Sequence, residues 1–123
     1  MFDHVKFGVS DYPASRAFFL KALEPLGIAE VVDWPPDGVE ICSRSGASLC
    51  LYRSDEKPAP LHLAFTARSR QEVDAFHRAA LEAGGRDNGG PGLRPQYSGT
   101  YYAAFVIGPD GHNIEAVCHE PEA

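Results

Sequence analysis

Two histidines and a glutamate are the candidate metal ligands of this sequence: His4, His62 and Glu115. Glu115 lies between Ile114 and Ala116 in a short run of apolar and β-branched residues, a pattern that predicts a strand. Burying a lone carboxylate costs so much free energy that Glu115 must reach water or have a positively charged partner. Two imidazoles and a carboxylate together form a set that can hold a divalent ion and leave coordination sites open.

Glu115 belongs to the second strand of a predicted hairpin whose turn is Gly-Pro-Asp-Gly at 108–111. Proline presets the φ angle of such a turn, and glycine is free to adopt positive φ. If Ile107 pairs with His112, Tyr102 shares the cleft face with Glu115. Tyr102 is then a candidate substrate-binding residue, with simple wall packing as the alternative.

His4 opens a stretch in which polar and apolar residues alternate, which predicts a half-buried strand with His4 and Lys6 on its polar face. A helix is expected from Pro13 to about Leu23, because apolar residues there recur at helical spacing. Three more strands are predicted at 29–34, 39–43 and 48–53. In the last of these, Ser48, Cys50 and Tyr52 share one face.

The pattern then begins again at His62. Residues 62–85 can be laid on residues 4–27 without a gap, a shift of 62 − 4 = 58 that superposes the two histidines. Ser69 and Glu72 have the spacing of a capping box, which predicts the start of a second helix. Additional residues rich in Gly and Pro lie at 87–100. The chain is therefore an internal repeat of one strand, one helix and three strands.

This repeat predicts an α+β fold of two tandem βαβββ modules that form a curved, barrel-like mixed sheet, with the helices outside and a central cleft. The chain is interpreted as one domain, 1–123, with module one at about 1–53 and module two at about 62–118. A pseudo-twofold arrangement places equivalent strands around one cleft. The inward positions are then His4, Cys50, His62 and Glu115.

Composition excludes several classes of partner. The 123 residues carry a formal net charge of −6, which argues against nucleic acid, whose binding proteins have basic faces. No apolar run approaches the length that spans a membrane, and no leader pattern precedes the first strand, so a cytoplasmic protein is expected. Three cysteines without a CxxC pair suggest neither a disulfide framework nor a zinc knuckle.

Three segments resemble the vicinal oxygen chelate superfamily, which includes glyoxalase I, extradiol dioxygenases, fosfomycin-resistance transferases and bleomycin-binding proteins. They are HVKFGVSD at 4–11, HLAF at 62–65 and DGHNIE at 110–115. The resemblance implies that His4, His62 and Glu115 are metal ligands, for Fe, Zn, Ni, Mn or Co. It also implies a fourth metal-ligand position, at the end of module one, that is often Glu or Gln in glyoxalase I. Cys50 stands there in this chain, either as a ligand or as a small residue that shapes the pocket.

The function implied by the resemblance is a metal-dependent, glyoxalase-like lyase or isomerase in which the metal chelates two neighbouring substrate oxygens and Glu115 moves the proton. A ring-cleaving dioxygenase with a His-His-Glu triad and a metal-free drug- or metabolite-binding protein are the alternatives. The substrate is expected to be a small molecule, with Lys6 and Tyr52 as further candidate contacts. Small members commonly pair modules across a subunit boundary, so a homodimer is expected. Three aromatic residues are available for its interface: Trp34, Tyr97 and Tyr101.

Overall fold

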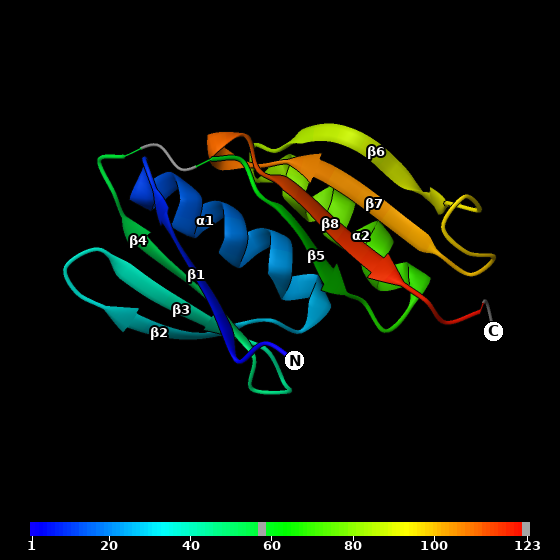
Figure 1. Cartoon of the computed structure of the whole chain (residues 1–123), viewed down its shortest axis with the longest axis horizontal. Helices are drawn as coiled ribbons and strands as arrows, with labels where there is room; N and C mark the ends of the chain where they lie inside the picture. Colours follow the sequence, from blue (N-terminus) through cyan, green and yellow to red (C-terminus); the bar gives the residue numbers. More distant parts are fainter. Residues whose placement is uncertain (57–58, 122–123) are drawn as a thin grey trace.

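Two four-stranded mixed sheets form the framework of the molecule (Figure 1). The structure is a computed structural model that describes residues 1–56 and 59–121. The first sheet has the strand order β1-β4-β3-β2 and the second has the order β5-β8-β7-β6. The strands of the first sheet are β1 (His4–Val9), β2 (Glu30–Trp34), β3 (Gly38–Cys42) and β4 (Ser48–Arg53). Those of the second are β5 (His62–Thr66), β6 (Arg86–Leu93), β7 (Tyr102–Ile107) and β8 (Asn113–Cys118).

Both sheets have the same pairing pattern, as the repeat predicts. The opening strand of each module runs parallel to the closing strand, and the remaining pairs are antiparallel. This confirms the α+β fold of tandem modules. In one respect the structure differs from the barrel-like sheet expected above. No strand pairing joins β1 to β5 among the described residues, so the sheets stay separate and do not close into a barrel.

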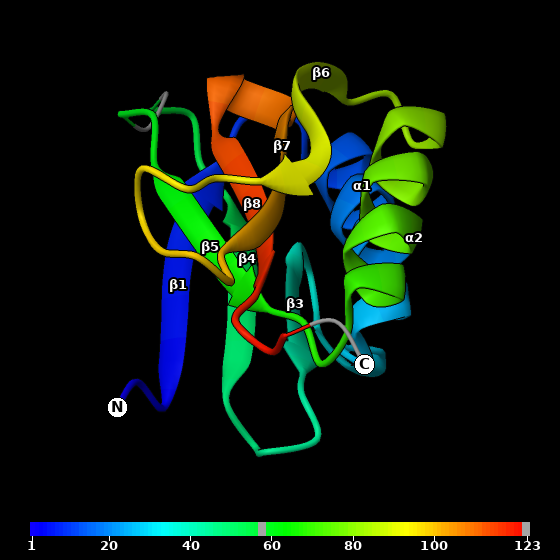
Figure 2. The ribbon, with the colours of Figure 1, turned by 90° about the vertical axis from the view of Figure 1, so that its right-hand side faces the viewer.

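Each module contributes one helix, α1 (Tyr12–Leu23) or α2 (Arg70–Glu82), and the two helices pack against each other. The side chain of Asp11 caps α1 by accepting from the N–H of Ala14 at 3.1 Å, and Ser69 caps α2 through the N–H of Glu72 at 3.2 Å. Single-turn 3₁₀ helices follow α1 at Glu24–Leu26 and join β7 to β8 at Pro109–Gly111. Figure 2 shows both helices on the same side of the sheets.

The hydrophobic core lies between the helices and the sheets and draws on both modules. Its largest fully buried side chains include Phe18, Phe19 and Phe76 from the helices and Ile41 and Ile114 from the strands. Because the helices cover one face of each sheet, the opposite faces remain open to bind other molecules. None of the helices in the described part of the chain is long and apolar enough to cross a membrane.

Strand β6 occupies the stretch where the sequence indicated only extra residues rich in Gly and Pro. Its pairing with β7 shifts register between Asp87 and Gly89 and again between Gly89 and Gly92. Pro91 and the glycines are tolerated because β6 is an edge strand, where a missing N–H and a bulge interrupt the ladder at little cost.

Candidate metal centre and substrate groove

Glu115 is a buried carboxylate with a partner on each oxygen. Its side chain is 2% exposed; Oε1 lies 2.8 Å from His62 Nε2, and Oε2 accepts from the hydroxyl of Tyr101 at 2.5 Å. The sequence predicted that Glu115 would reach water or have a partner, and in the structure its partners are His62 and Tyr101. The register explains how Glu115 meets His62, because Glu115 pairs with Ala64 on β5 and His62 lies two residues earlier on the same face. Long side chains reach across such diagonal positions.

Tyr101 was not expected in the site. Burial, followed by the hydrogen bond to Glu115, raises the pKa of Tyr101 to about 12, so its hydroxyl remains a donor at neutral pH. The ring is also held by aromatic neighbours, with the centroid of Tyr97 at 4.9 Å and that of His119 at 5.2 Å. Tyr101 thus positions one oxygen of Glu115 and leaves the other facing His62.

The hairpin register explains why Tyr101 takes the place considered for Tyr102. Ile107 pairs with Asn113 rather than His112, so Tyr102 points to the helix side, where its hydroxyl donates to Asp74 at 2.7 Å. His112 precedes the paired residues of β8, and its ring is buried, with Nδ1 accepting from the N–H of Leu61 at 2.9 Å. A glycine-containing turn does not reveal this one-residue change in register.

His4 lies on the other module, at the start of β1, and its side chain is 56% exposed. Its Nδ1 is 2.7 Å from the carboxylate of Asp3. An ionised carboxylate can only accept, so Nδ1 donates to Asp3, and in the neutral imidazole the free lone pair is then on Nε2. A carboxylate behind a histidine is the usual second-shell arrangement of a metal-binding imidazole.

The four predicted inward residues do not form one cluster within a single chain. Within residues 1–56 and 59–121, no group of three His, Cys, Asp or Glu side chains could hold a metal ion. His62 and Glu115 meet on the second sheet, and His4 and Cys50 lie on the first. His4 and His62 do, however, both line one groove of about 650 Å³ at the boundary of the two sheets.

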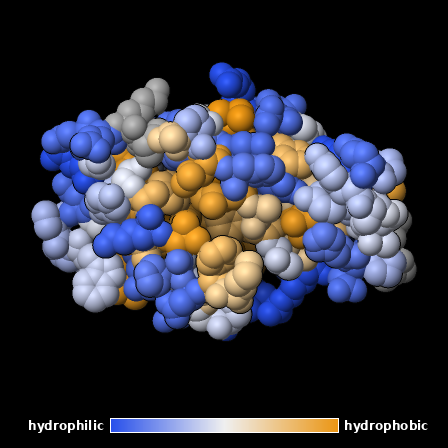
Figure 3. Space-filling model, viewed as in Figure 1, coloured by the Kyte–Doolittle hydropathy of each residue, from blue (hydrophilic) through white to orange (hydrophobic). Residues whose placement is uncertain are grey.

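Apolar residues of both modules line this boundary groove. Figure 3 shows hydrophobic side chains gathered over the centre of the molecule, where the sheets face each other. The apolar residues that line the groove are Met1, Phe2, Val5, Leu26, Ile28, Ala47, Leu49, Leu63, Ala64 and Phe65.

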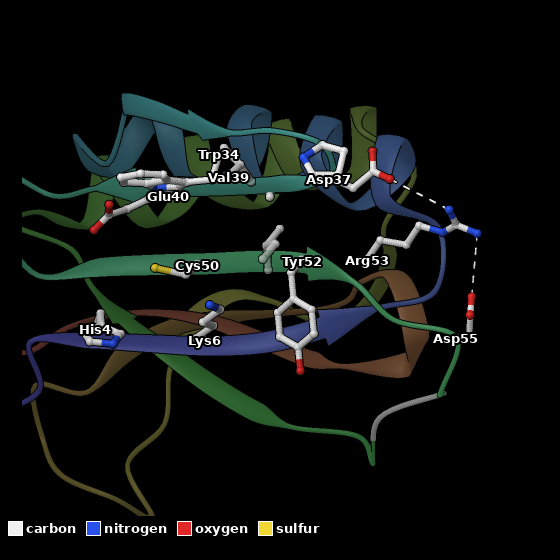
Figure 4. Close-up of a pocket in the computed structure, with 13 residues that line it drawn as sticks. His4, Lys6, Trp34, Asp37, Val39, Glu40, Cys50, Tyr52, Arg53 and Asp55 are labelled. Carbon is white, nitrogen blue, oxygen red and sulfur yellow. Dashed lines mark ion pairs between the residues drawn. The ribbon is translucent and has the colours of Figure 1, made fainter.

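A second groove, of about 710 Å³, lies over the first sheet and is called the module-one groove here (Figure 4). His4, Lys6, Cys50 and Tyr52 line it together, so all four predicted module-one residues share one surface. Trp34, Gly38, Glu40 and Arg53 are among its other residues.

Glu40 is a second carboxylate that the sequence analysis missed. It pairs directly with Cys50 across β3 and β4, and its Oε2 accepts from the hydroxyl of Ser48 at 2.8 Å. The Ser48 oxygen is 3.9 Å from Cys50 Sγ. The sequence carried a signal that could have identified Glu40. Val39 and Ile41 on either side are buried, so strand alternation places Glu40 on the polar face.

The donor atoms of the second sheet fit a metal ion. Two ligands about 2.1 Å from one ion and at a right angle to each other lie about 3.0 Å apart. His62 Nε2 and Glu115 Oε1 are hydrogen-bonded at 2.8 Å, and a bound ion would have to take the place of that hydrogen; the side chain of His62 is 56% exposed and that of Glu115 is 2% exposed. His4 Nε2 is an available third donor of the same chemical type. The residues therefore suit a divalent ion, two of them from one module and the third from the other.

Comparisons with known proteins identify the family. A family profile described as the glyoxalase/bleomycin resistance protein/dioxygenase superfamily matches residues 1–116. A glyoxalase/bleomycin resistance protein from Albidiferax ferrireducens is 31% identical, with a TM-score of 0.83 over 96% of this chain and 98% of that chain. A search of proteins with curated functions gave no match.

Two further solved structures share the fold. A glyoxalase/dioxygenase from Nostoc punctiforme is 24% identical with a TM-score of 0.73, over 99% of this chain and 92% of that chain. A glyoxalase-related enzyme from Fulvimarina pelagi is 20% identical with a TM-score of 0.73, over 94% of this chain and 85% of that chain. The profile match over residues 1–116 and the 31% identical relative show that the chain belongs to the glyoxalase/bleomycin resistance protein/dioxygenase superfamily.

Proposed function

We propose that the protein is a small metal-dependent enzyme, a glyoxalase-like lyase or isomerase that acts on a substrate with two neighbouring oxygens. The observation that carries this proposal is the pair formed by His62 and Glu115, with Tyr101 holding the second carboxylate oxygen. A buried carboxylate fixed at 2.8 Å from an exposed imidazole is an organised half of a metal site.

The other half of the site is proposed to come from a second copy of the chain. His4 is too far from His62 and Glu115 to form a three-ligand group with them in one chain. A homodimer that covers the apolar boundary groove would bring His4 of one copy to His62 and Glu115 of the other. Covering this groove would also remove its exposed apolar surface from water, which favours association.

The chain's own residues would then bind the substrate and move a proton. A metal held by His4, His62 and Glu115 supplies Lewis-acid chemistry, which stabilises negative charge on oxygen. Glu115 would accept the proton from the carbon next to the carbonyl and return it to the adjacent carbon, so that it serves as both ligand and base. Tyr101 keeps Oε2 in place during this transfer.

Two alternatives follow from specific observations. Cys50 stands where glyoxalase I often has a fourth ligand, so three ligands remain, His4, His62 and Glu115. Two histidines and one glutamate suit a ring-cleaving dioxygenase that uses ferrous iron. The absence of a three-ligand group in the described residues of one chain favours instead a protein that binds a drug or metabolite without metal.

Metal analysis of protein purified without a His-tag tests the proposal. Wild-type protein should hold close to one divalent ion per chain, and His62→Ala should lose it while the domain stays folded by circular dichroism. His77→Ala is the matched control, because His77 pairs with Asp87 on the outside of the second module. Equal trace metal in wild type and His62→Ala would refute the metal site. Light scattering at micromolar concentration should show a dimer rather than a monomer of 13.3 kDa.

A further inference from the structure

The module-one groove has aromatic walls and a floor without large side chains. Trp34, Gly38 and Tyr52 pair in register across β2, β3 and β4, so Gly38 lies between the two aromatic residues. Neighbouring strands are about 4.8 Å apart, which separates the two aromatic positions by about 9.6 Å. Figure 4 shows the Trp34 ring on the Glu40 side and the Tyr52 ring over β1. Gly38 and the small Cys50 leave the floor between them open.

The ring of Tyr52 lies beside this floor, and Tyr52 is 43% exposed. Tyr52 pairs with Gly8, and a Cβ atom added to Gly8 would lie 3.4 Å from Tyr52 Cζ. The ring can therefore lie close to the backbone of β1 because Gly8 has no side chain. The ammonium group of Lys6 is 5.4 Å from the centroid of the same ring, within the range of a cation–π contact.

Lys6 is the cation of the groove that is left for a ligand. Arg53 already faces the carboxylates of Asp37 at 3.9 Å and Asp55 at 3.7 Å. Among the described residues, by contrast, no carboxylate lies within ion-pair distance of Lys6. An anionic group placed beside the Tyr52 ring would supply that missing partner.

We propose that the module-one groove binds a planar aromatic monocarboxylate, with the ring over Gly38 and Cys50 between the aromatic walls and the carboxylate at Lys6. This proposal goes beyond the proposed function, because the module-one groove lies on the first sheet and contains neither His62 nor Glu115. The charge of the groove favours a monoanion over a phosphate dianion: Asp37, Glu40 and Asp55 repel a second negative charge, and Lys6 alone is uncommitted. A groove of about 710 Å³ is large enough for such a ligand.

Trp34 makes the test direct, because it is the only tryptophan in the chain. Protein freed of metal with EDTA is titrated with benzoate, and Trp34 fluorescence and calorimetry are followed. Benzamide tests the need for the charge, and cyclohexanecarboxylate tests the need for the flat ring. We expect saturable binding of benzoate and at least tenfold weaker binding of both analogues.

The variants separate the roles of charge and ring. Lys6→Met keeps most of the aliphatic stem and should weaken benzoate binding at least tenfold, whereas Lys21→Met, on the outer helix and paired with Glu82, should not change it. By calorimetry, Trp34→Phe should retain binding and Trp34→Ala should lose it. The proposal is overturned if benzoate does not bind, if benzamide binds equally well, or if Lys6→Met has no effect. Since no metal is present, these outcomes are independent of whether the metal site exists.

Discussion

Replacing Tyr101 with Phe removes a single hydroxyl and leaves a buried carboxylate with one oxygen unpaired. Glu115 is 2% exposed, so water cannot replace the 2.5 Å hydrogen bond without local rearrangement. Hydrogen bonds to charged groups contribute about 1.5–3 kcal/mol. We therefore expect Tyr101→Phe to lower the free energy of unfolding by about 2 kcal/mol, a large fraction of the stability of a small domain.

Urea unfolding of metal-free protein at pH 7, followed by circular dichroism, measures this loss. With a denaturant dependence of about 2 kcal/mol per molar urea, the midpoint should fall by about 1 M. Tyr97→Phe is the control, because Tyr97 is 63% exposed and contacts Tyr101 through its ring. A double-mutant cycle of Tyr101→Phe and Glu115→Gln isolates the pairwise coupling.

The pH dependence gives this prediction a second readout. The pKa of Tyr101 is raised from 10.0 to about 12, so the folded state keeps the proton in a range where the unfolded state loses it. This contribution to stability is fully present below pH 10 and is lost as the pH rises through 12. The difference between wild type and Tyr101→Phe should therefore shrink over that window. A Tyr101→Phe variant as stable as wild type at pH 7, or a coupling near zero, would refute the reasoning.

Two further residues give separate predictions. His112 is buried, which lowers its pKa below 6.5, so wild type should lose stability as the pH falls below 6.5, and His112→Gln should flatten this dependence in urea unfolding. A wild type with constant stability from pH 7 to 5 would contradict that. Cys50→Ala should leave metal content unchanged, because a metal that chelates two substrate oxygens needs open positions rather than a closed tetrahedral shell. An intense thiolate-to-metal charge-transfer band in cobalt-substituted wild type, lost in Cys50→Ala, would instead make Cys50 a ligand.

The sequence predicts the fold well because the repeat and the strand alternation are local patterns. The strand at 48–53 has the predicted bounds, and the Ser69 cap forms as the spacing of Ser69 and Glu72 indicates. Strand β6 could not be found in this way, because its pairing partner β7 supplies the order that Gly89 and Pro91 lack. Edge strands take part of their structure from a neighbour, and no local pattern encodes it.

The candidate site could be predicted only in part, because some of its residues are brought together by strand pairing. Glu115 could be singled out because an isolated carboxylate in an apolar strand needs a partner, and His62 is that partner. Tyr101 depends on cross-strand register, which a sequence fixes only through the turn, whereas strand alternation alone places Glu40 on the polar face. Ile107 pairs with Asn113 rather than with His112, and this register places Tyr101 instead of Tyr102 beside Glu115.

The proposed metal ligands are divided between the two modules, and this division has a thermodynamic consequence for the proposed enzyme. Tyr101 and His62 fix the buried Glu115 within one module, so that half is organised before the halves meet, whereas the contact of His4 with Asp3 in the other module is exposed to solvent. If a dimer joins the halves, an ion that binds only the complete set stabilises the dimer by mass action. Dimerisation would in turn raise the affinity for the ion by the same factor, because coupling between two binding equilibria is reciprocal. Metal content measured on dilute protein would then understate the affinity of the assembled site, and occupancy and oligomeric state must be measured at the same concentration.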